Sequence, residues 1–334
     1  DPVYQKLTGP GGDFEIVEEN VLGQTMPVFR HRYRSLPELF LDSQKHGDRE
    51  FMVDGDRRVT YREHCEMVKA ITHLLATEYG IGKGDRVAIF AENSIEWDVA
   101  FWSLMHLGAI GVAMNGWWTG PEFMHAWRLS EPKLLLGDAK RLARLGDEDL
   151  QVPVLDMAGT FIPNYPASGE KTPELPVVAI DEDDPALIMF TSGTTGKAKG
   201  AVISHRTEIG FTQCTLFATA YTMAQWGLTL ADRPPGVTLG TSPFFHISGL
   251  GGLLLLTRAN GDKVVLYHGS FDPDRALSLI DREKVTTWTA LGGMGPKIIS
   301  CPNLDQYDLS SVTALIFGGS PVSESVQEAL RTIF

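Results

Sequence analysis

The residues best suited to chemistry lie in a polar loop at 191–200, which follows an apolar run at 187–190. The loop reads Thr-Ser-Gly-Thr-Thr-Gly-Lys-Ala-Lys-Gly. Glycines let the backbone approach an anion and turn its amides toward it, while hydroxyls and lysines add donors and positive charge. We therefore expect the loop to bind a triphosphate, with a plain polar surface turn as the alternative. The residues expected to hold the phosphates are Thr191, Ser192, Gly193, Thr194, Thr195, Gly196, Lys197 and Lys199.

This loop is not a Walker A sequence. That pattern requires a glycine five residues before the Gly-Lys pair, and residue 191 is threonine. Residues 201–204 predict a strand, whereas a helix follows the loop of P-loop NTPases. The spacing disfavours a P-loop kinase or NTPase and favours a phosphate loop between two strands.

A second candidate for chemistry is His246, which lies in the aromatic segment 243–249. A histidine between aromatic residues is more often a core residue than a functional one. Its position after a predicted strand, about 50 residues beyond the polar loop, favours a place at the site instead.

Alternating strands and helices must position these residues. Short apolar or β-branched runs predict strands at 86–90, 109–114, 133–137, 187–190, 201–204, 237–241, 263–266, 286–290 and 314–317. Caps and amphipathic periodicity predict helices at about 93–107, 120–129, 272–283 and 293–300. This alternation predicts an α/β fold of two lobes, each a mostly parallel sheet flanked by helices.

A stretch rich in proline, glycine and acidic residues at 156–185 separates two halves of this pattern. We expect an N-terminal extension at 1–34, a first α/β lobe at 35–175 and a second lobe at 176–334 that carries the polar loop. The last residues form an amphipathic helical face of Val322, Val326, Ala329, Leu330 and Ile333. Because such a helix normally leads to another element, we expect the chain to be the N-terminal part of a longer protein.

The composition disfavours several classes of protein. With 29 Lys and Arg against 42 Asp and Glu, the net charge is −13, which disfavours binding along nucleic acid. Three distant cysteines predict neither disulfides nor a zinc site and fit a reducing cytosol. The N-terminus lacks a signal sequence, and the longest apolar run, around 250–257, is too short to cross a bilayer, so we expect a soluble, cytoplasmic protein.

One basic cluster lies near the N-terminus. We interpret it as a solvated face, with peripheral membrane contact as the alternative. Its members are Arg30, His31, Arg32 and Arg34.

The loop at 191–200 resembles the signature loop of the acyl-adenylate-forming (ANL) superfamily, which includes acyl-CoA synthetases, amino-acid adenylation domains and beetle luciferases. The usual form has proline before the second lysine, and this sequence has Ala198 there, which we expect to loosen the loop modestly without removing a donor. The resemblance implies that the loop binds the β- and γ-phosphates of ATP and that Lys199 is the catalytic lysine. It also implies a catalytic role for Thr194, which would contact Mg²⁺.

Two further segments resemble motifs of the same superfamily. Residues 243–249 resemble its Pro-x-Phe-His segment, which implies that His246 is catalytic and that the substrate pocket includes Phe245, His246 and Gly249. Residues 314–322 resemble the segment that lies against adenine, with a plain strand-to-helix turn as the alternative. The adenine contacts implied there are Gly318, Gly319, Ser320 and Pro321.

Two other features bear on the substrate. Segment 243–249 has no carboxylate, whereas amino-acid adenylation domains place an aspartate in this region to pair with the substrate ammonium. An amino-acid substrate is therefore disfavoured. Trp117 and Trp118 belong to another landmark of the superfamily, and we interpret them as packing residues rather than ligand contacts.

The resemblance covers the chain from about residue 35 and implies an AMP-forming acyl-CoA synthetase. A carboxylic acid, expected to be a fatty acid, would react with ATP and Mg²⁺ to give an acyl-adenylate, and coenzyme A would then displace AMP. The alternatives are a fatty acyl-AMP ligase that passes the acyl group to a carrier protein and, outside the family, a non-catalytic nucleotide- or lipid-binding protein. The superfamily's magnesium-binding glutamate, ribose-binding aspartate and C-terminal lid domain are expected beyond residue 334, so we expect the isolated chain to be inactive.

Overall fold

The computed structural model describes residues 1–334 except 168, 192–196, 292 and 319–320. Within the described residues the strands form two six-stranded sheets and one separate hairpin. The first sheet contains, in spatial order, β10 (Lys199–Ser204), β9 (Pro185–Thr191), β6 (Ile110–Ala113), β5 (Arg86–Phe90), β7 (Leu134–Gly137) and β8 (Val154–Asp156). The second contains β14 (Ala314–Gly318), β13 (Thr287–Leu291), β11 (Val237–Gly240), β12 (Lys263–Leu266), β3 (Glu50–Asp54) and β4 (Arg57–Thr60).

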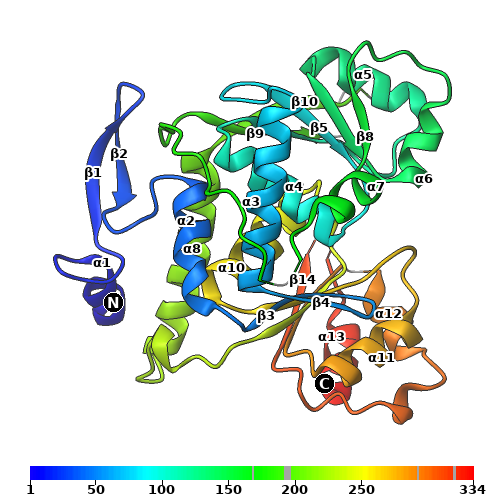
Figure 1. Ribbon diagram of the computed structural model, residues 1–334. Helices are drawn as coiled ribbons and strands as arrows, with labels where there is room; N and C mark the ends of the chain where they lie inside the picture. The colour runs from blue at the N-terminus through cyan, green and yellow to red at the C-terminus, as the bar shows by residue number, and fades with distance from the viewer. Residues whose placement is uncertain (168, 192–196, 292, 319–320) are drawn as a thin grey trace.

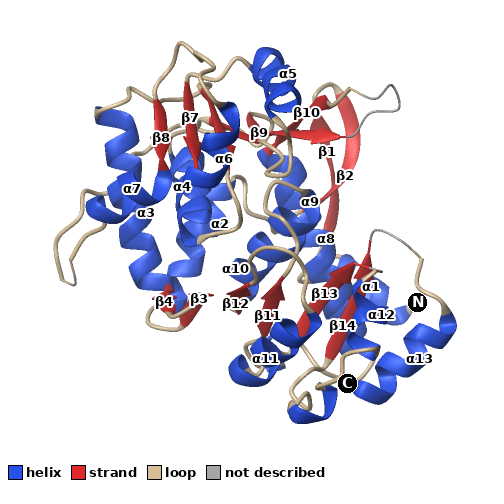
Figure 2. Ribbon diagram, turned by 90° about the vertical axis from the view of Figure 1, so that its right-hand side faces the viewer, coloured by secondary structure: helices blue, strands red, loops and turns tan. Residues whose placement is uncertain are grey.

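Both sheets are parallel apart from one antiparallel strand at an edge, β10 in the first and β4 in the second. Helices lie against them (Figure 2). The helices are α1 (Pro2–Thr8), α2 (Leu36–Asp42), α3 (Tyr61–Thr77), α4 (Ile95–His106), α5 (Gly120–Ser130), α6 (Ala139–Leu142), α7 (Met157–Phe161), α8 (His205–Ala224), α9 (Ile247–Gly249), α10 (Leu256–Asn260), α11 (Pro273–Glu283), α12 (Met294–Ile299) and α13 (Glu324–Ile333). The predicted α/β fold with two mostly parallel sheets is confirmed.

Each sheet draws strands from both halves of the sequence. The strands β9 and β10 join the sheet that residues 86–156 begin, because β9 pairs with β6. The strands β3 and β4 join the later sheet, because β3 pairs with β12. The division of the chain at residue 175 stays a prediction, and the sheets are interlocked across it.

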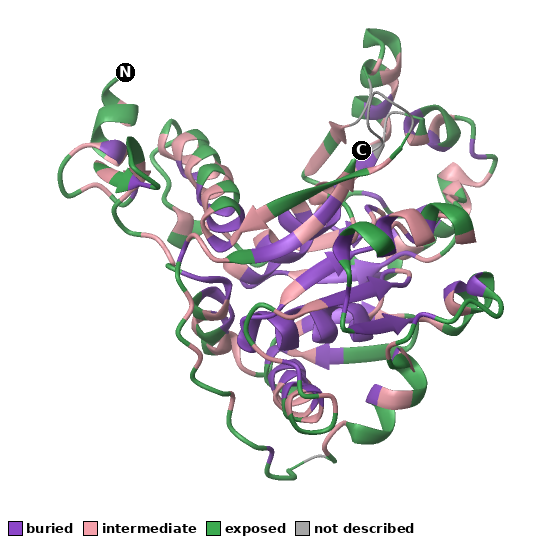
Figure 3. Cartoon of the chain, turned by 90° about the horizontal axis from the view of Figure 1, so that it is seen from above, coloured by how far each residue is buried: buried purple, intermediate pink, exposed green. Residues whose placement is uncertain are grey.

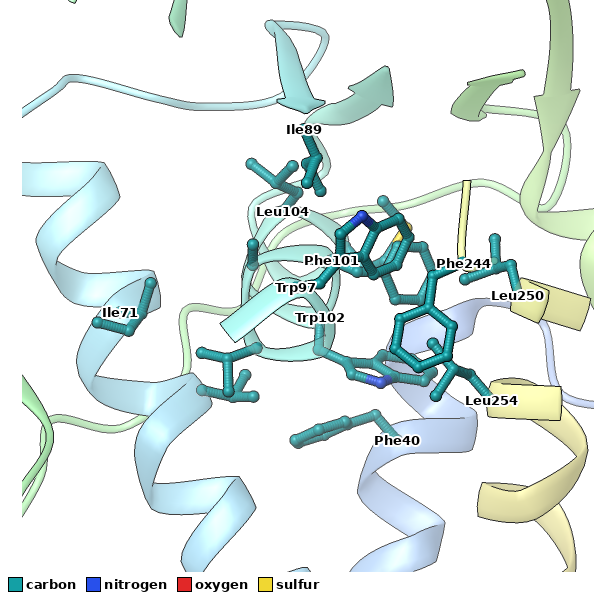
Figure 4. Packing of buried hydrophobic residues seen from close by; sticks show 14 of the residues in the cluster. Phe40, Ile71, Ile89, Trp97, Phe101, Trp102, Leu104, Phe244, Leu250 and Leu254 are labelled. Atoms are coloured by element: carbon teal, nitrogen blue, oxygen red, sulfur yellow. The ribbon is translucent and has the colours of Figure 1, made fainter. Parts of the chain in front are cut away.

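The helix α4 lies at the centre of the core that joins the two sheets. All of its residues are buried, Glu96 and Asp98 included, so the amphipathic helix expected at 93–107 has no solvent-exposed face. The reason is its surroundings: α2, α3 and β6 contact it, and Trp97 packs against Phe244 with ring centroids 5.4 Å apart. Figure 4 shows the rings of Trp97, Phe101 and Trp102 between α3 and the segment that carries Leu250 and Leu254.

A buried cation also ties the later half of the chain to α4. Arg258 of α10 is fully buried, and its guanidinium carbon lies 4.2 Å from the ring centroid of Phe51 and 4.6 Å from that of Phe40. It also reaches Asp98 of α4 at 3.4 Å. A buried charge requires a partner of opposite sign, so the carboxylate of Asp98 stabilises Arg258 in the core.

The N-terminal residues form α1 and a hairpin of β1 (Ile16–Val21) and β2 (Gln24–Phe29), which lie at the edge of the molecule beside α8 (Figures 1 and 3). Arg32 departs from the expected solvated face: its side chain is 4% exposed and bonds to Glu182 at 2.7 Å and Glu19 at 2.7 Å. The hairpin is thereby fastened to the segment that leads into β9. No helix among the described residues is long and apolar enough to span a membrane.

Candidate functional site

The predicted site residues follow the carboxyl ends of parallel strands. The polar loop follows β9, segment 243–249 follows β11, and Gly318 ends β14. Because β9 is parallel to β6, and β14 is parallel to β13 and hence to β11, each sheet presents these loops at its carboxyl edge. In open α/β sheets, ligands bind in the crevice outside that edge.

A cavity of ≈ 460 Å³ lies at the carboxyl edges of both sheets. Its walls come from the loops after β5, β6 and β7 of the first sheet and after β11, β12 and β13 of the second. The lining residues are Glu92, Trp117, Lys140, Arg141, Arg144, Thr241, Pro243, Tyr267, Gly269, Ser270, Phe271 and Met294. A volume of this size is in the range of small-molecule sites.

Asn93 fixes one wall of this cavity. Its Nδ2 donates to the Ser242 carbonyl at 2.8 Å, and its Oδ1 accepts the Phe244 amide at 2.8 Å. Pro243, which lines the cavity, is therefore held from both sides by a side chain of the opposite sheet. Asn93 begins the helix predicted at 93–107 and was not among the predicted site residues; its place three residues after the end of a buried strand was the signal for a site residue.

The residues predicted from segment 243–249 have different environments. Phe244 is fully buried in the core, and Gly249 is buried as the last residue of α9. His246 is exposed and caps α9, where its Nδ1 lies 3.0 Å from Ser248 Oγ. The predicted roles of Phe245, His246 and Gly249 in the substrate pocket and of His246 in catalysis stay predictions.

Phe245 meets a residue that the sequence did not place at the site. The ring of Trp117 stands at 90° to that of Phe245, with centroids 5.2 Å apart. Trp117 is 67% exposed and lines the cavity, so it is not the packing residue that we expected. Trp118 does pack, against Phe190 with centroids 5.3 Å apart. The exposed ring of Trp117 offers an aromatic face to a ligand.

The wall formed by α6 and the residues after it is cationic. Arg141 is 6% exposed and is neutralised by Glu92 and Asp138, both at 3.0 Å. Burial opposes ionisation of Glu92, but the Gly269 amide and the Arg141 guanidinium outweigh it and hold its pKa below the usual value. Among the described residues, no carboxylate lies within 4.0 Å of Lys140 or Arg144. Their charge remains available to an anionic ligand.

The two ends of the polar loop are paired with each other. Thr191 at the end of β9 is the register partner of Lys199 at the start of β10, and both are exposed. Beside the returning end lies a hollow of ≈ 510 Å³ lined by Trp118, Pro121, Glu122, His125, Arg128, Lys197 and Ala198. The predicted contacts Ser192, Gly193, Thr194, Thr195 and Gly196 lie outside the described residues.

The predicted adenine segment is described in part. Gly318 is half-buried and pairs with Leu291 in register, and Pro321 is exposed. Gly319 and Ser320 lie outside the described residues. In the described part of the chain, no three His, Cys, Asp or Glu side chains are grouped so that they could hold a metal ion. The Mg²⁺ contact predicted at Thr194 thus rests on a residue outside that part.

Comparison with known proteins adds a family and relatives. The family described as AMP-binding enzyme matches residues 39–334. The chain is 28% identical to 4-coumarate–CoA ligase 2 of Oryza sativa subsp. japonica over 80% of this chain and 48% of that protein. It spans about half the length of the curated relatives that it matches.

Two solved structures share the fold. The inhibitor-bound N-terminal domain of FACL13 from Mycobacterium tuberculosis has a TM-score of 0.76 and 23% identity, covering 90% of this chain and 73% of that one. The O-succinylbenzoate coenzyme A synthetase MenE of Bacillus subtilis, in complex with AMP, has a TM-score of 0.68 and 26% identity, covering 88% and 70%. The similarity extends over both sheets.

Proposed function

The chain belongs to the family of AMP-binding enzymes, and on this premise we propose that it activates an organic carboxylic acid as its acyl-adenylate and transfers the acyl group to coenzyme A. The observation that carries the proposal is the cavity at the carboxyl edges of both sheets, with Trp117, whose ring contacts Phe245, on one wall and Lys140 and Arg144 on another. The strand β9 leads into the hydroxyl-, glycine- and lysine-containing loop at the same edge of its sheet.

The first step requires little covalent chemistry from the protein. A carboxylate oxygen of the acid attacks the α-phosphorus of ATP, the bond to the β-phosphate oxygen breaks, and pyrophosphate leaves. Charge accumulates on phosphate oxygens, so fixed donors aimed at them supply most of the acceleration. We assign this work to the loop hydroxyls and amides and to Lys197 and Lys199. Mg²⁺ would neutralise charge between the phosphates, and Thr194 is the residue proposed to contact it.

Coenzyme A as the acyl acceptor is supported by the cationic wall. Lys140 of α6 and Arg144 just after it line the cavity, and in the described part of the chain no carboxylate lies within 4.0 Å of either. Coenzyme A carries phosphates at one end and a thiol at the other, so anchored phosphates would let the thiol reach the acyl carbonyl. In that second step the thiol gives up its proton to solvent, the sulfur bonds to the carbonyl carbon, and the bond from that carbon to the phosphate oxygen breaks, so AMP leaves.

A fatty acid remains the proposed substrate class. Segment 243–255 carries no ionisable side chain except His246, and Leu250, Leu253, Leu254 and Leu255 are buried within it. A charged acyl group would lack a partner there. The exposed ring of Trp117 and the relative named for 4-coumarate favour an aromatic acid as the second candidate.

The test is acid-dependent exchange of pyrophosphate into ATP by the natural polypeptide that contains this chain. The acids are short, medium and long fatty acids, 4-coumarate and an amino acid, and the acceptors are coenzyme A and an acyl carrier protein. We expect fatty acids to support exchange and coenzyme A to release AMP. If 4-coumarate is the one acid that supports exchange, the substrate is an aromatic acid instead of a fatty acid. If the acyl group is transferred to the carrier protein and not to coenzyme A, the enzyme is an acyl-AMP ligase. If none of the carboxylic acids supports exchange, the proposal is refuted.

A further inference from the structure

The returning end of the polar loop has few contacts that fix its position. It enters β10, an edge strand of the first sheet whose one strand partner among the described residues is β9. Lys199, Gly200, Ala201 and Val202 are all exposed, so side-chain packing holds this part of the strand weakly. Any bond just before Lys199 therefore has a large share in placing the lysine.

One such bond comes from α5. The Nε2 atom of His125 lies 3.0 Å from the carbonyl oxygen of Ala198, and because a carbonyl oxygen only accepts, the ring nitrogen must carry the hydrogen. Ala198 is the residue between Lys197 and Lys199, so the bond from His125 restrains the backbone next to both lysines.

The helix that carries His125 is itself firmly placed. It starts at a capping box in which Glu122 accepts from the amide and hydroxyl of Thr119, both at 2.8 Å. Its opposite face is buried in the core, where Phe123 packs on Phe90 with ring centroids 4.7 Å apart and Trp127 stacks on Phe123 at 5.6 Å. An anchored helix can hold a loop still.

We propose that His125 is a positioning residue, which fixes the Ala198 carbonyl and thereby sets the two lysines of the loop for polyphosphate. The inference rests on the proposed function, because it takes the loop to be the phosphate site. Alanine at 198 leaves φ free, and a proline there would restrict φ without any help from α5. The imidazole bond supplies from outside the loop the restraint that the loop sequence lacks.

The test measures binding of ATP and of AMP to the natural polypeptide that contains this chain by calorimetry, together with the melting temperature. We expect His125→Ala to lower the affinity for ATP about tenfold, which is the effect of losing one well-placed hydrogen bond. The affinity for AMP should stay within about twofold of the wild-type value, because AMP lacks the β- and γ-phosphates. His125→Gln, which keeps an N–H donor, and the double variant His125→Ala with Ala198→Pro should both recover most of the affinity for ATP. Leu129→Ala, an exposed change on the same helix, is the matched control.

Each outcome decides a separate point. Wild-type affinity for ATP in His125→Ala, or no recovery in either rescue variant, would overturn the inference. Equal weakening of ATP and AMP with a lower melting temperature would show a structural role instead. A wild-type chain that bound ATP no better than AMP would refute the phosphate loop itself, and this inference with it.

Discussion

The side-chain oxygen Oδ1 of Asn93 accepts a hydrogen bond from the backbone N–H of Phe244 at 2.8 Å, across the boundary between the two sheets. The nitrogen of the same carboxamide donates to Ser242, so one side chain holds the backbone on both sides of Pro243. Asn93 follows β5 of the first sheet and Phe244 follows β11 of the second. The wall of the cavity thus depends on a contact between residues 151 positions apart.

Asn93→Ala should destabilise the fold and loosen this wall. Asn93 is 7% exposed, and its loss leaves the Phe244 amide and the Ser242 carbonyl without their partner. We expect the free energy of unfolding, measured by urea denaturation, to fall by about 2–4 kcal/mol. The control is Asn164→Ala, an exposed asparagine bonded to Thr160, which should change it by less than about 0.5 kcal/mol. A loss equal to the control's would show that the bridge contributes nothing.

Gly249→Ala should also destabilise the protein, for a steric reason. A Cβ atom at Gly249 would stand 2.0 Å from the Pro243 carbonyl oxygen, so the turn before α9 would have to move. We expect the free energy of unfolding, measured by urea denaturation, to fall by about 2 kcal/mol or more, and binding of the acid to be disturbed. Gly210→Ala is the matched control: it lies inside α8 with nothing within 4 Å, and alanine there should stabilise by about 0.5–1 kcal/mol. If alanine at Gly249 lowered the free energy of unfolding no more than alanine at Gly210 does, the steric argument would be contradicted.

The elements could be predicted from the sequence because their signals are local. The helix predicted at about 93–107 begins at a cap, because the Ser94 hydroxyl accepts from the Trp97 amide at 3.1 Å. Asp272 accepts from the Arg275 amide at 2.9 Å at the start of α11, close to the predicted 272–283. A buried strand such as 86–90 can be predicted equally well, because its apolar residues are consecutive in the chain.

Strand order and most of the cavity could not be predicted in this way. The pairing of β3 with β12 joins residues about 210 positions apart, and only packing of the whole molecule selects it. Lys140 and Arg144 belong to no pattern in the sequence that marks a ligand site, because surface cations are usually solvated. Trp117 belongs to a landmark of the superfamily that we interpreted as packing, the usual role of a tryptophan. All three become site residues because the carboxyl ends of two sheets converge on one cavity.

The stability of the fold should depend on the ionisation of Glu208 in α8. This side chain is fully buried, and neither carboxylate oxygen has a hydrogen-bond partner among the described residues. Burial raises its pKa from 4.5 to about 7. An acid with a raised folded pKa binds its proton more tightly in the native state, so stability falls as pH rises from about 4.5 and levels off above about 7.

Glu208→Gln removes this dependence. We compare the free energies of unfolding of the variant and the wild type by chemical denaturation at each pH. We expect the difference between them to shift by about 2 kcal/mol in favour of the variant as the pH rises from about 5 to about 8. Gln213→Leu is the control, because it changes a buried polar residue of the same helix that does not titrate. A stability difference between Glu208→Gln and wild type that stays constant across this range would contradict a titrating group at this position.

Lys199→Ala should separate the chemical role of the loop from its structural one. Lys199 is exposed at the first position of an edge strand, so its side chain adds little to the packing of the sheet, and unfolding should be nearly unchanged. In the natural polypeptide that contains this chain, we expect acid-dependent pyrophosphate exchange to fall roughly 10²- to 10³-fold, by analogy with removing one donor from an oxyanion site. The same change at Lys171, an exposed lysine of the 156–185 segment, should leave exchange within about twofold. A fall of less than about threefold at Lys199, with the fold intact, would mean that the charge on the departing pyrophosphate is stabilised elsewhere, and the assignment of the lysine would fail.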